Sequence, residues 1–289
     1  MRIDKLHIIL LVCVLTLLGY IVIRSTQQNN NSTVITNDSL AKWKLPNLRD
    51  VNIATDSGKM IIHGNNILTF TSRYVGPLAK NPELRYAGNN LSCSNCHFNG
   101  GRERKTLNLV GVTKRYPKYI ERLKDTLNII QRVNGCFMRS LNGRPLPEDS
   151  YEMKSILAYL NFISEYIPEH KMVEYQGIEK IPPFNGTLDT AIGKVMYSIK
   201  CMSCHGSDGV GAPNNLVENP EGMFYIVPPI AGKDSFNKGA GMSILEEAAT
   251  FIYHEMPYNN RGSLTVEEAY QIANYVVSLP RPDYNMSKK

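Results

Sequence analysis

The chain lacks the features that mark several common classes of protein. Its 289 residues include six cysteines, too few for a disulfide scaffold of this length. The formal net charge is only +6, and no basic stripe interleaved with aromatic residues indicates a nucleic-acid interface. A mild positive charge fits a small anionic substrate, although it also fits many proteins without one. We therefore expect no nucleic-acid partner and look for function in local motifs.

Two motifs of the form Cys-x-x-Cys-His contain most of the cysteines. Their residues are Cys93, Cys96 and His97 in the first motif, and Cys201, Cys204 and His205 in the second. Each cysteine pair can form two thioether bonds to haem vinyl groups, and the adjacent histidine then binds the iron as proximal ligand. A zinc site built from four cysteines is the alternative, but the histidine after each second cysteine favours haem. The motifs therefore predict two covalently bound haem c groups.

One long uncharged run occurs, at residues 6–23. Arg2 and Lys5 precede it and Arg24 follows it, and its length is close to the minimum that spans a bilayer. The positive N-terminus should stay in the cytoplasm, so the remainder is exported. Because no A-x-A cleavage site follows, we favour an uncleaved membrane anchor over a removed signal peptide. We predict a location on the periplasmic side of the bacterial inner membrane, which agrees with haem attachment outside the cytoplasm.

Composition and motif positions divide the chain into segments. A polar stretch at 27–39 indicates a spacer, and Pro182 and Pro183 lie in a second linker. The predicted segments are a membrane anchor or signal at 1–24, a flexible linker at 25–40, a first cytochrome c domain at 41–170, a linker at 171–186, a second cytochrome c domain at 187–282 and a tail at 283–289.

Helices are the predicted regular elements of both domains. A helix over 188–200 leads into the second motif, and a capping box of Thr265 and Glu268 precedes a closing helix over 266–279. In the first domain, Ser150 can cap a helix that runs to residue 164. A helix entering the haem motif and a helix closing the domain are typical of class I cytochromes c. We therefore predict a mainly α fold of two tandem class I cytochrome c-like domains, each around one covalently bound haem, after the N-terminal membrane segment.

Three residues are candidates for the second axial ligand of the second haem. Met256 is followed by Pro257 and lies just before the closing helix, where small c-type cytochromes place their ligand methionine. Met242, within a glycine-rich stretch, is the alternative, and His254 is the weakest of the three because histidines of this kind are mostly surface residues.

Cys136 and Met138 compete for the same position at the first haem. A free thiol in an oxidising compartment is a liability unless something occupies it, and iron coordination would do so. If residues 127–142 are helical, Arg132, Cys136 and Ser140 lie on one face. The Asn134-Gly135 pair weakens that helix because it is also a turn signal. Spacing alone favours Cys136 only slightly over Met138.

Several longer segments resemble one family. They are residues 85–91 with the first motif, 115–117, 134–147, 234–242, 251–252 and 256–257. In these segments the sequence resembles the thiosulfate dehydrogenase family of dihaem c-type cytochromes, some of whose members also act as tetrathionate reductases. The resemblance covers roughly residues 58–282, and the segment around Cys136 is its most specific part.

The resemblance implies roles for particular residues. The first haem would be the active site with His97 and Cys136 as its iron ligands, and the pocket would be lined by Arg122, Arg132 and Ser140. The second haem would relay electrons, with His205 and Met256 as ligands. The implied substrates are thiosulfate and tetrathionate, and the implied partner is an external redox protein or membrane electron carrier.

Two other functions remain open from the sequence. The first is a membrane-anchored dihaem electron carrier without its own substrate, in which Met138 would bind the first iron and Cys136 would be packing. The second is a haem-based sensor or a subunit of a larger respiratory complex. A thiolate-haem signal in electron paramagnetic resonance separates the enzyme from the electron carrier.

Overall fold

The computed structural model describes residues 44–175, 177–213 and 224–284, without the side chains of Arg122, His170 and Val173. These residues form mostly helices, which confirms the predicted mainly α fold. The predicted anchor at 1–24 and linker at 25–40 lie outside them. In the part of the chain that is described, no helix is both long enough and apolar enough to cross a bilayer.

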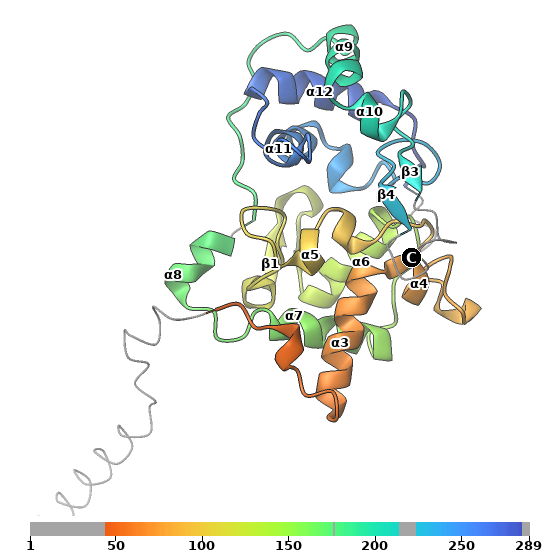
Figure 1. Cartoon of the computed structure of the whole chain (residues 1–289), viewed down its shortest axis with the longest axis vertical. Coiled ribbons are helices and arrows are strands. Elements are labelled where there is room, and N and C mark those ends of the chain that lie inside the picture. The colour runs from red at the N-terminus through yellow and green to blue at the C-terminus, as the bar shows by residue number, and fades with distance from the viewer. Residues whose placement is uncertain (1–43, 176, 214–223, 285–289) are drawn as a thin grey trace, which may run out of the picture. The chain divides into compact units, whose positions relative to one another are not determined.

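The first half contains six helices and one small hairpin among the described residues (Figure 1). The helices are α3 (Asp56–Thr69), α4 (Thr71–Val75), α5 (Phe98–Gly101), α6 (Ile129–Arg139), α7 (Tyr151–Phe162) and α8 (Glu169–Met172). The hairpin pairs β1 (Lys118–Ile120) with β2 (Asp125–Leu127) in antiparallel register, with Tyr119 opposite Thr126. Short 3-10 turns occur at η1 (Leu48–Asp50), η2 (Pro82–Leu84), η3 (Cys93–Asn95), η4 (Val112–Arg115), η5 (Glu121–Leu123) and η6 (Val173–Tyr175).

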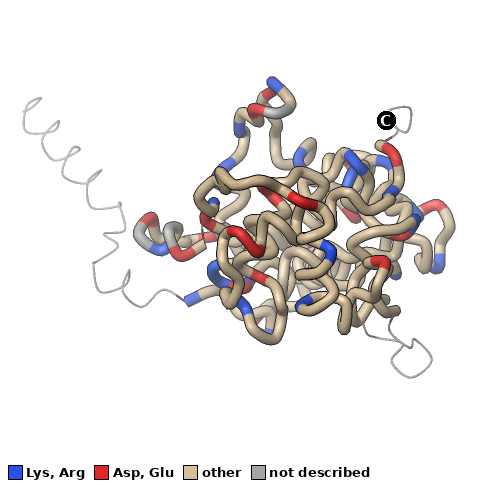
Figure 2. Tube along the Cα trace, turned by 90° about the horizontal axis from the view of Figure 1, so that it is seen from above, with Lys and Arg blue, Asp and Glu red and all other residues tan. Residues whose placement is uncertain are grey.

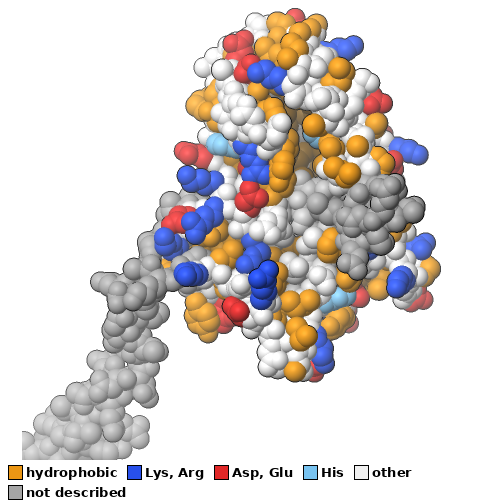
Figure 3. Space-filling view, viewed as in Figure 1, with side chains coloured by type: hydrophobic (Ala, Val, Ile, Leu, Met, Phe, Trp, Pro, Cys, Tyr) orange, Lys and Arg blue, Asp and Glu red, His pale blue; other side chains and the backbone are white. Residues whose placement is uncertain are grey.

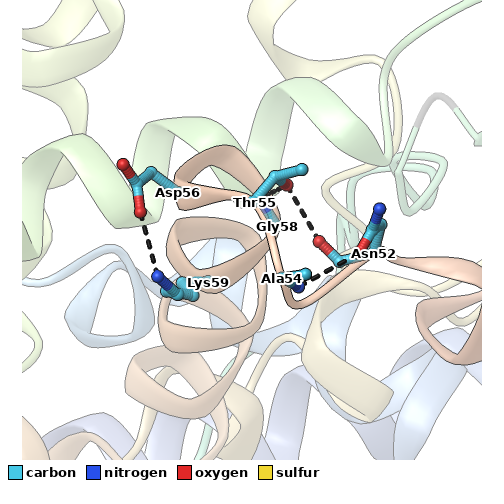
Figure 4. Close-up of polar contacts among 6 residues, drawn as sticks. All are labelled: Asn52, Ala54, Thr55, Asp56, Gly58 and Lys59. Atoms are coloured by element: carbon cyan, nitrogen blue, oxygen red, sulfur yellow. Dashed lines mark hydrogen bonds and ion pairs between the residues drawn. The ribbon is translucent and has the colours of Figure 1, made fainter.

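Helix α3 begins at a set of local hydrogen bonds that its sequence provides (Figure 4). The Thr55 hydroxyl accepts the Gly58 N–H at 3.0 Å and donates to the Asn52 carbonyl at 2.8 Å. The Asn52 side chain in turn accepts the Ala54 N–H at 3.0 Å. The bond to Gly58 satisfies an N–H group of the first turn, which has no partner within the helix, and the other two fix the Asn52–Thr55 turn that precedes it.

The second half contains α9 (Thr190–Lys200), α10 (Met202–His205), α11 (Leu245–Glu255) and α12 (Val266–Ser278). A short antiparallel pair joins β3 (Ala212–Pro213) and β4 (Tyr225–Val227), and the turn η7 (Gly241–Ser243) precedes α11. Helix α12 packs against both α9 and α11, and Ala249, Ala269 and Ala273 are fully buried where these helices meet.

Both halves use the same close crossing of two helices. In the first, α3 packs on α7, and a Cβ on Gly64 would lie 2.0 Å from the Ser155 carbonyl oxygen. In the second, α9 packs on α12, and a Cβ on Gly193 would lie 2.1 Å from the Gln271 carbonyl oxygen. In each pair the approach is possible only because the residue has no side chain. The two halves therefore repeat one architecture.

The predicted helix ends agree closely with the observed ones. The Ser150 side chain accepts the Met153 N–H at 3.2 Å, and the capping box of Thr265 and Glu268 forms with bonds of 2.9 and 3.2 Å. The helix predicted over 188–200 begins two residues later, because the Asp189 side chain caps it by accepting the Ala191 N–H at 2.7 Å.

Positions of basic and acidic residues occur throughout the described part of the trace, with both signs interspersed (Figure 2). On the face shown in Figure 3, acidic and basic side chains alternate with hydrophobic ones. This distribution agrees with the scattered charges of the sequence and presents no broad surface of a single sign on that face.

Candidate functional site

The first Cys-x-x-Cys-His motif is held by the beginning of α4. The Cys93 N–H donates to the Thr71 hydroxyl at 3.1 Å, and that hydroxyl lies 3.5 Å from the Cys93 sulfur. Burial raises the pKa of Cys93 to about 11 and that of Cys96 to about 12. Both thiols are unpaired with any other cysteine.

His97 makes a hydrogen bond that fixes its tautomer. Its Nδ1 donates to the Leu107 carbonyl, which leaves Nε2 as the unprotonated nitrogen. Burial lowers the pKa of His97 to about 4, so the imidazole is neutral at physiological pH. A neutral imidazole is the form that binds a metal.

Helix α6 supplies a thiol and a guanidinium in direct contact. The Arg132 Nη1 donates to the Cys136 sulfur at 2.7 Å. The charge of Cys136 raises the pKa of Arg132, and the Tyr116 hydroxyl adds to this effect. The two side chains meet because they are four residues apart on one helix.

The Cys136 side chain lies near the first motif. After burial, its charge is among the causes that raise the pKa values of Cys93 and Cys96. The charge of Arg132 likewise contributes, after burial, to the low pKa of His97. Cys136 and Arg132 therefore interact electrostatically with the cysteines and the histidine of the first motif.

The other two residues predicted for this site are Ser140, whose side chain the structure describes, and Arg122, whose side chain it does not. Ser140 follows the last turn of α6, in helical conformation, so it continues the face that contains Arg132 and Cys136. Its half-buried side chain makes no hydrogen bond to another described residue, and its carbonyl accepts from Asn89 at 3.1 Å. The Arg122 backbone lies in η5, but its side chain is outside the described part of the structure.

The turn signal at Asn134-Gly135 does not end α6, contrary to one possibility left open by the sequence. The Asn134 side chain donates to the Leu146 carbonyl at 3.0 Å and accepts the Leu146 N–H at 2.9 Å. A Cβ on Gly135 would lie 2.3 Å from Nη2 of Arg139, so glycine leaves room for that guanidinium. The tertiary bonds of Asn134 to Leu146 offset its weak helix propensity, and Gly135 makes room for a side chain of the same helix.

The second motif repeats the arrangement of the first. The His205 Nδ1 contacts the Pro228 carbonyl at 3.2 Å, and burial lowers the pKa of His205. Cys201 is half-buried and Cys204 is exposed. His205 can therefore present its Nε2 to a metal, as His97 does.

Three residues are candidates for the second axial ligand of the second haem. One of them, His254, already makes a polar contact. Its Nε2 contacts the Glu179 carbonyl at 2.8 Å, which places it against the segment between the two halves. Met256 follows directly after α11 and is half-buried, and Met242 lies in η7. Among the described residues, neither the Met256 nor the Met242 sulfur makes a contact of this kind, so both remain candidates for the ligand.

The Met256→Leu variant is expected to lose the charge-transfer absorption that is typical of ferric His/Met haem, because leucine has no sulfur to bind iron. His254→Ala is the matched control and should keep that absorption, since its ring contacts Glu179. The measurement is the visible and near-infrared spectrum of both purified variants. Retention in Met256→Leu with loss in Met242→Leu would assign the ligand to Met242.

Buried donors without a partner test whether haem groups fit beside these motifs. Among the described residues, Nε and Nη2 of Arg73 in α4 are buried without a hydrogen bond, as is Nη1 of Arg281 after α12. An unpaired buried donor is costly, so each position fits an anionic group that the polypeptide itself does not supply. Haem c carries two propionates, which match such donors. No group of three or more His, Cys, Asp or Glu side chains within the described ranges could form the alternative zinc site.

A charged cluster joins the two halves beside both motifs. Arg261 donates to Glu103 of the first half and lies 3.6 Å from Glu255 of the second. Its guanidinium also lies over the rings of Phe98, at 4.8 Å, and Tyr258, at 4.4 Å. Phe98 directly follows His97 and Glu255 directly precedes Met256, so this one side chain connects segments next to both proposed iron sites.

The Arg261→Met variant is expected to lower the free energy of unfolding by about 2 kcal/mol at pH 8, because it leaves Glu255 buried without its counter-charge. Burial raises the pKa of Glu255 to about 7, from an ordinary value of 4.5 that it regains in the unfolded chain. A carboxylate with a raised folded pKa binds its proton more tightly in the folded state, so stability falls as pH rises between these values. Removing Arg261 raises the folded pKa further, and this decline continues to higher pH in the variant.

The difference between Arg261→Met and the wild type should therefore grow as pH rises through 7, as measured by denaturant unfolding from pH 5 to 9. The double variant Arg261→Met/Glu255→Gln is the matched control and should recover most of the loss at pH 8. A loss that is independent of pH would show that Arg261 acts through Glu103 or through its packing on Phe98 and Tyr258, and not by neutralising Glu255.

Comparison with known proteins gives a consistent result. Residues 85–168 match the family model described as SoxA/TsdA, cytochrome c domain, and residues 190–280 match the cytochrome c model. These matches confirm the two predicted cytochrome c domains and lie within the ranges 41–170 and 187–282 predicted for them.

Three curated relatives carry one name. Thiosulfate dehydrogenase of Allochromatium vinosum is 35% identical over 229 residues, which are 78% of this chain and 79% of that protein. The protein of that name from Stutzerimonas stutzeri is 34% identical over 225 residues, 78% of this chain and 68% of the other. A third, from Psychrobacter arcticus, is 39% identical over 197 residues, which are 68% and 58% of the two chains.

A solved structure shares the fold. The thiosulfate dehydrogenase (TsdBA) from Marichromatium purpuratum superposes with a TM-score of 0.71 at 22% identity. The match covers 87% of this chain but 52% of that one, so the present chain spans about half the length of its structural neighbour.

Proposed function

Because the chain belongs to the thiosulfate dehydrogenase family of c-type cytochromes with two covalently bound haem c groups, we propose that its reaction takes place beside the first haem, with Cys136 as the catalytic thiol. The chain is an oxidoreductase that acts on thiosulfate. The proposed reaction joins two thiosulfate ions into tetrathionate, and the reverse reduction uses the same groups.

One observation carries this proposal. The Cys136 sulfur accepts a hydrogen bond from Arg132 at 2.7 Å, next to the cysteines and histidine of the first motif. A cysteine without a function is usually a small apolar packing residue, whereas Cys136 is half-buried and contacts a guanidinium. A thiolate is both the nucleophile and the metal ligand, and a neighbouring guanidinium can donate a hydrogen bond to it.

The residues of this chain that would hold the cofactors follow from the motifs. Cys93 and Cys96 would attach the first haem and Cys201 and Cys204 the second, with His97 and His205 as proximal ligands. We assign Cys136 as the second ligand of the first iron and Met256 as that of the second. Each bound haem c accepts one electron, so the two groups together match the two electrons that leave when two thiosulfate ions join.

Positive charge beside Cys136 would offset the repulsion between two dianionic substrates. The Arg132 guanidinium can hold sulfonate oxygens by paired hydrogen bonds while it remains in contact with the thiolate. We assign Arg122 and Ser140 to the same pocket, where Ser140 would donate one further hydrogen bond. The Ser140 hydroxyl is unengaged among the described residues, which leaves it available for this role.

Cys136 would also act covalently. Its thiolate would form a cysteinyl S–S bond with the sulfane sulfur of one thiosulfate, and the two electrons removed in this oxidation would be accepted by the two haem groups, one each. A second thiosulfate then attacks that sulfane sulfur, which forms tetrathionate and returns the thiolate of Cys136. The charge balances in both steps, and no proton is transferred.

The proposal includes the path of the electrons and the place of the reaction. Electrons would pass from the first haem to the second and then to an external small cytochrome or membrane electron carrier. Haem attachment occurs outside the bacterial cytoplasm, which supports a periplasmic location. The anchor at residues 1–24 remains a prediction from the sequence.

The direct test is a pair of assays on the purified dihaem protein. Thiosulfate with an artificial electron acceptor should yield tetrathionate, and tetrathionate with a reduced donor should yield thiosulfate. The ferric protein should also give the low-spin resonance of a thiolate-ligated haem. Absence of turnover in both directions, together with a first haem of His/Met type, would favour the electron carrier in which Met138 binds the iron.

A further inference from the structure

The end of α6 is completed by the other cytochrome domain. The last carbonyls of a helix have no partner within it and must be satisfied by other groups. In α6 this end is the part that follows Cys136 directly. The Cys136 carbonyl accepts the Leu141 N–H at 3.0 Å, and the Phe137 carbonyl accepts the Gly143 N–H at 2.9 Å.

The next two carbonyls of α6 are bound by one residue of the second domain, Asn237. Its Nδ2 donates to the Met138 carbonyl at 2.9 Å, and its backbone N–H donates to the Arg139 carbonyl at 3.2 Å. The second hydrogen of Nδ2 reaches Oδ1 of Asn142 at 3.1 Å. Asn237 is 1% exposed, so these bonds lie away from solvent.

Asn89 joins the same contact from the side of the first motif, four residues before Cys93. Its Nδ2 donates to the Ser140 carbonyl and to the Ser235 carbonyl, both at 3.1 Å. Its Oδ1 accepts the Leu91 N–H at 3.2 Å, within the stretch that leads into the motif. One buried side chain thus connects the first motif, the end of α6 and the loop of the second domain.

That loop, residues 234–240, is itself firmly attached to the end of its own domain. The Lys238 N–H donates to the Pro282 carbonyl at 3.0 Å, and Oδ1 of Asn237 accepts the Gly239 N–H at 3.0 Å. Phe236 lies under the guanidinium of Arg281, 4.6 Å from the ring centre. A shift of this loop would therefore move the group that caps α6.

We propose that Asn237 is a positioning residue, by which the second cytochrome domain fixes the last turn of α6 and so the orientation of Cys136 at the first haem. This inference rests on the proposed function, in which Cys136 is an iron ligand and catalytic thiol. It adds that the active site of the first domain is complete only while the loop of the second domain is docked. The loop leads directly into η7 with Met242, so the contact also links α6 to the segment around the second haem.

The test uses Asn237→Asp, which has the same shape but replaces both Nδ2 hydrogens with a second acceptor. Its carboxylate would face the Met138 carbonyl and the Asn142 side chain, so the contact becomes repulsive. In the full dihaem protein we expect the thiolate-haem resonance to weaken or split into several species, and kcat to fall about 10-fold. Haem content and the absorption of the second haem should be unchanged, which shows that the variant is folded.

Two further variants make the result specific. Asn274→Asp is the matched control and should behave as wild type, because among the described residues Nδ2 of Asn274 donates only to the Thr190 hydroxyl, at 3.3 Å within the second domain. Asn142→Gly removes one acceptor of Asn237 at a residue with φ of 48°, where glycine fits without strain, and should give a smaller change in the same direction.

An unaltered resonance and activity in Asn237→Asp would overturn the inference while leaving the proposed function intact. A wild-type protein without any thiolate-haem resonance would overturn both.

Discussion

The Cys136→Gly variant is expected to lose thiosulfate oxidation by at least about 10³-fold, because removing an essential nucleophile leaves only binding and electrostatic contributions. Both haem groups should remain attached, since Cys136 belongs to neither motif. Glycine at this position loses the sulfur that accepts from Arg132 and leaves the guanidinium without its partner. The measurement is tetrathionate formation with an artificial acceptor, alongside haem content per chain.

Cys136→Met separates the two roles that we assign to this sulfur. A thioether can bind iron but cannot form the cysteinyl S–S bond, so the variant should fold, keep a six-coordinate first haem and remain inactive. Loss of the thiolate-haem resonance in both variants identifies the ligand. Activity above about one tenth of wild type in either variant would refute an essential thiol, since removing an essential nucleophile costs far more than about tenfold.

Local signals predicted the parts of the fold that depend on neighbouring residues. The caps at Ser150 and Thr265 formed as expected, because an oxygen-bearing side chain bonds to an N–H three residues away wherever the helix is placed. The face shared by Arg132, Cys136 and Ser140 also followed from helical spacing. The N-terminal limit of α9 was two residues off, since the cap at Asp189 was not recognised.

Contacts between distant residues were not predictable in the same way. The sequence gives no sign that His254 binds the Glu179 carbonyl or that Arg261 bridges Glu103 and Glu255. These pairs form only because the fold brings separate segments together. The segment around Asn237 was singled out through the family resemblance, but its contact with α6 required coordinates.

At Asn134 a tertiary contact overrides a local turn preference, and at Gly135 the lack of a side chain makes room for Arg139 of the same helix. Both residues favour a turn, and glycine in a helix interior costs roughly 1 kcal/mol relative to alanine. Here the Asn134 side chain makes two hydrogen bonds to the Leu146 backbone, and Gly135 admits the Arg139 guanidinium. The helix is therefore continuous through the pair, which is what brings Arg132 within 2.7 Å of Cys136.

The Arg132→Met variant is expected to reduce kcat/KM for thiosulfate by about 10²-fold, the scale for removing one preorganised charged donor from an active site. Methionine fills similar space but provides neither the hydrogen bond to the Cys136 sulfur nor positive charge for two dianions. Arg132→Lys keeps the charge and loses the planar fork, so its loss should be smaller, about 10-fold. The measurement is steady-state kinetics with thiosulfate at low and high ionic strength.

Arg144→Met is the matched control for Arg132→Met. Arg144 follows α6 in the chain, but its guanidinium donates to the Glu83 carbonyl at 3.1 Å and stacks 4.0 Å from the Tyr86 ring centre. Its kinetics should stay within about twofold of wild type, as expected for an exposed side chain away from the reacting atoms. The activities of wild type and Arg144→Met should fall with added salt, since screening weakens the attraction between the protein and the thiosulfate dianion. Arg132→Met should show a weaker salt dependence, because the charge that salt would screen is gone. Equal activities and equal salt dependence in Arg132→Met and Arg144→Met would assign Arg132 to structure alone.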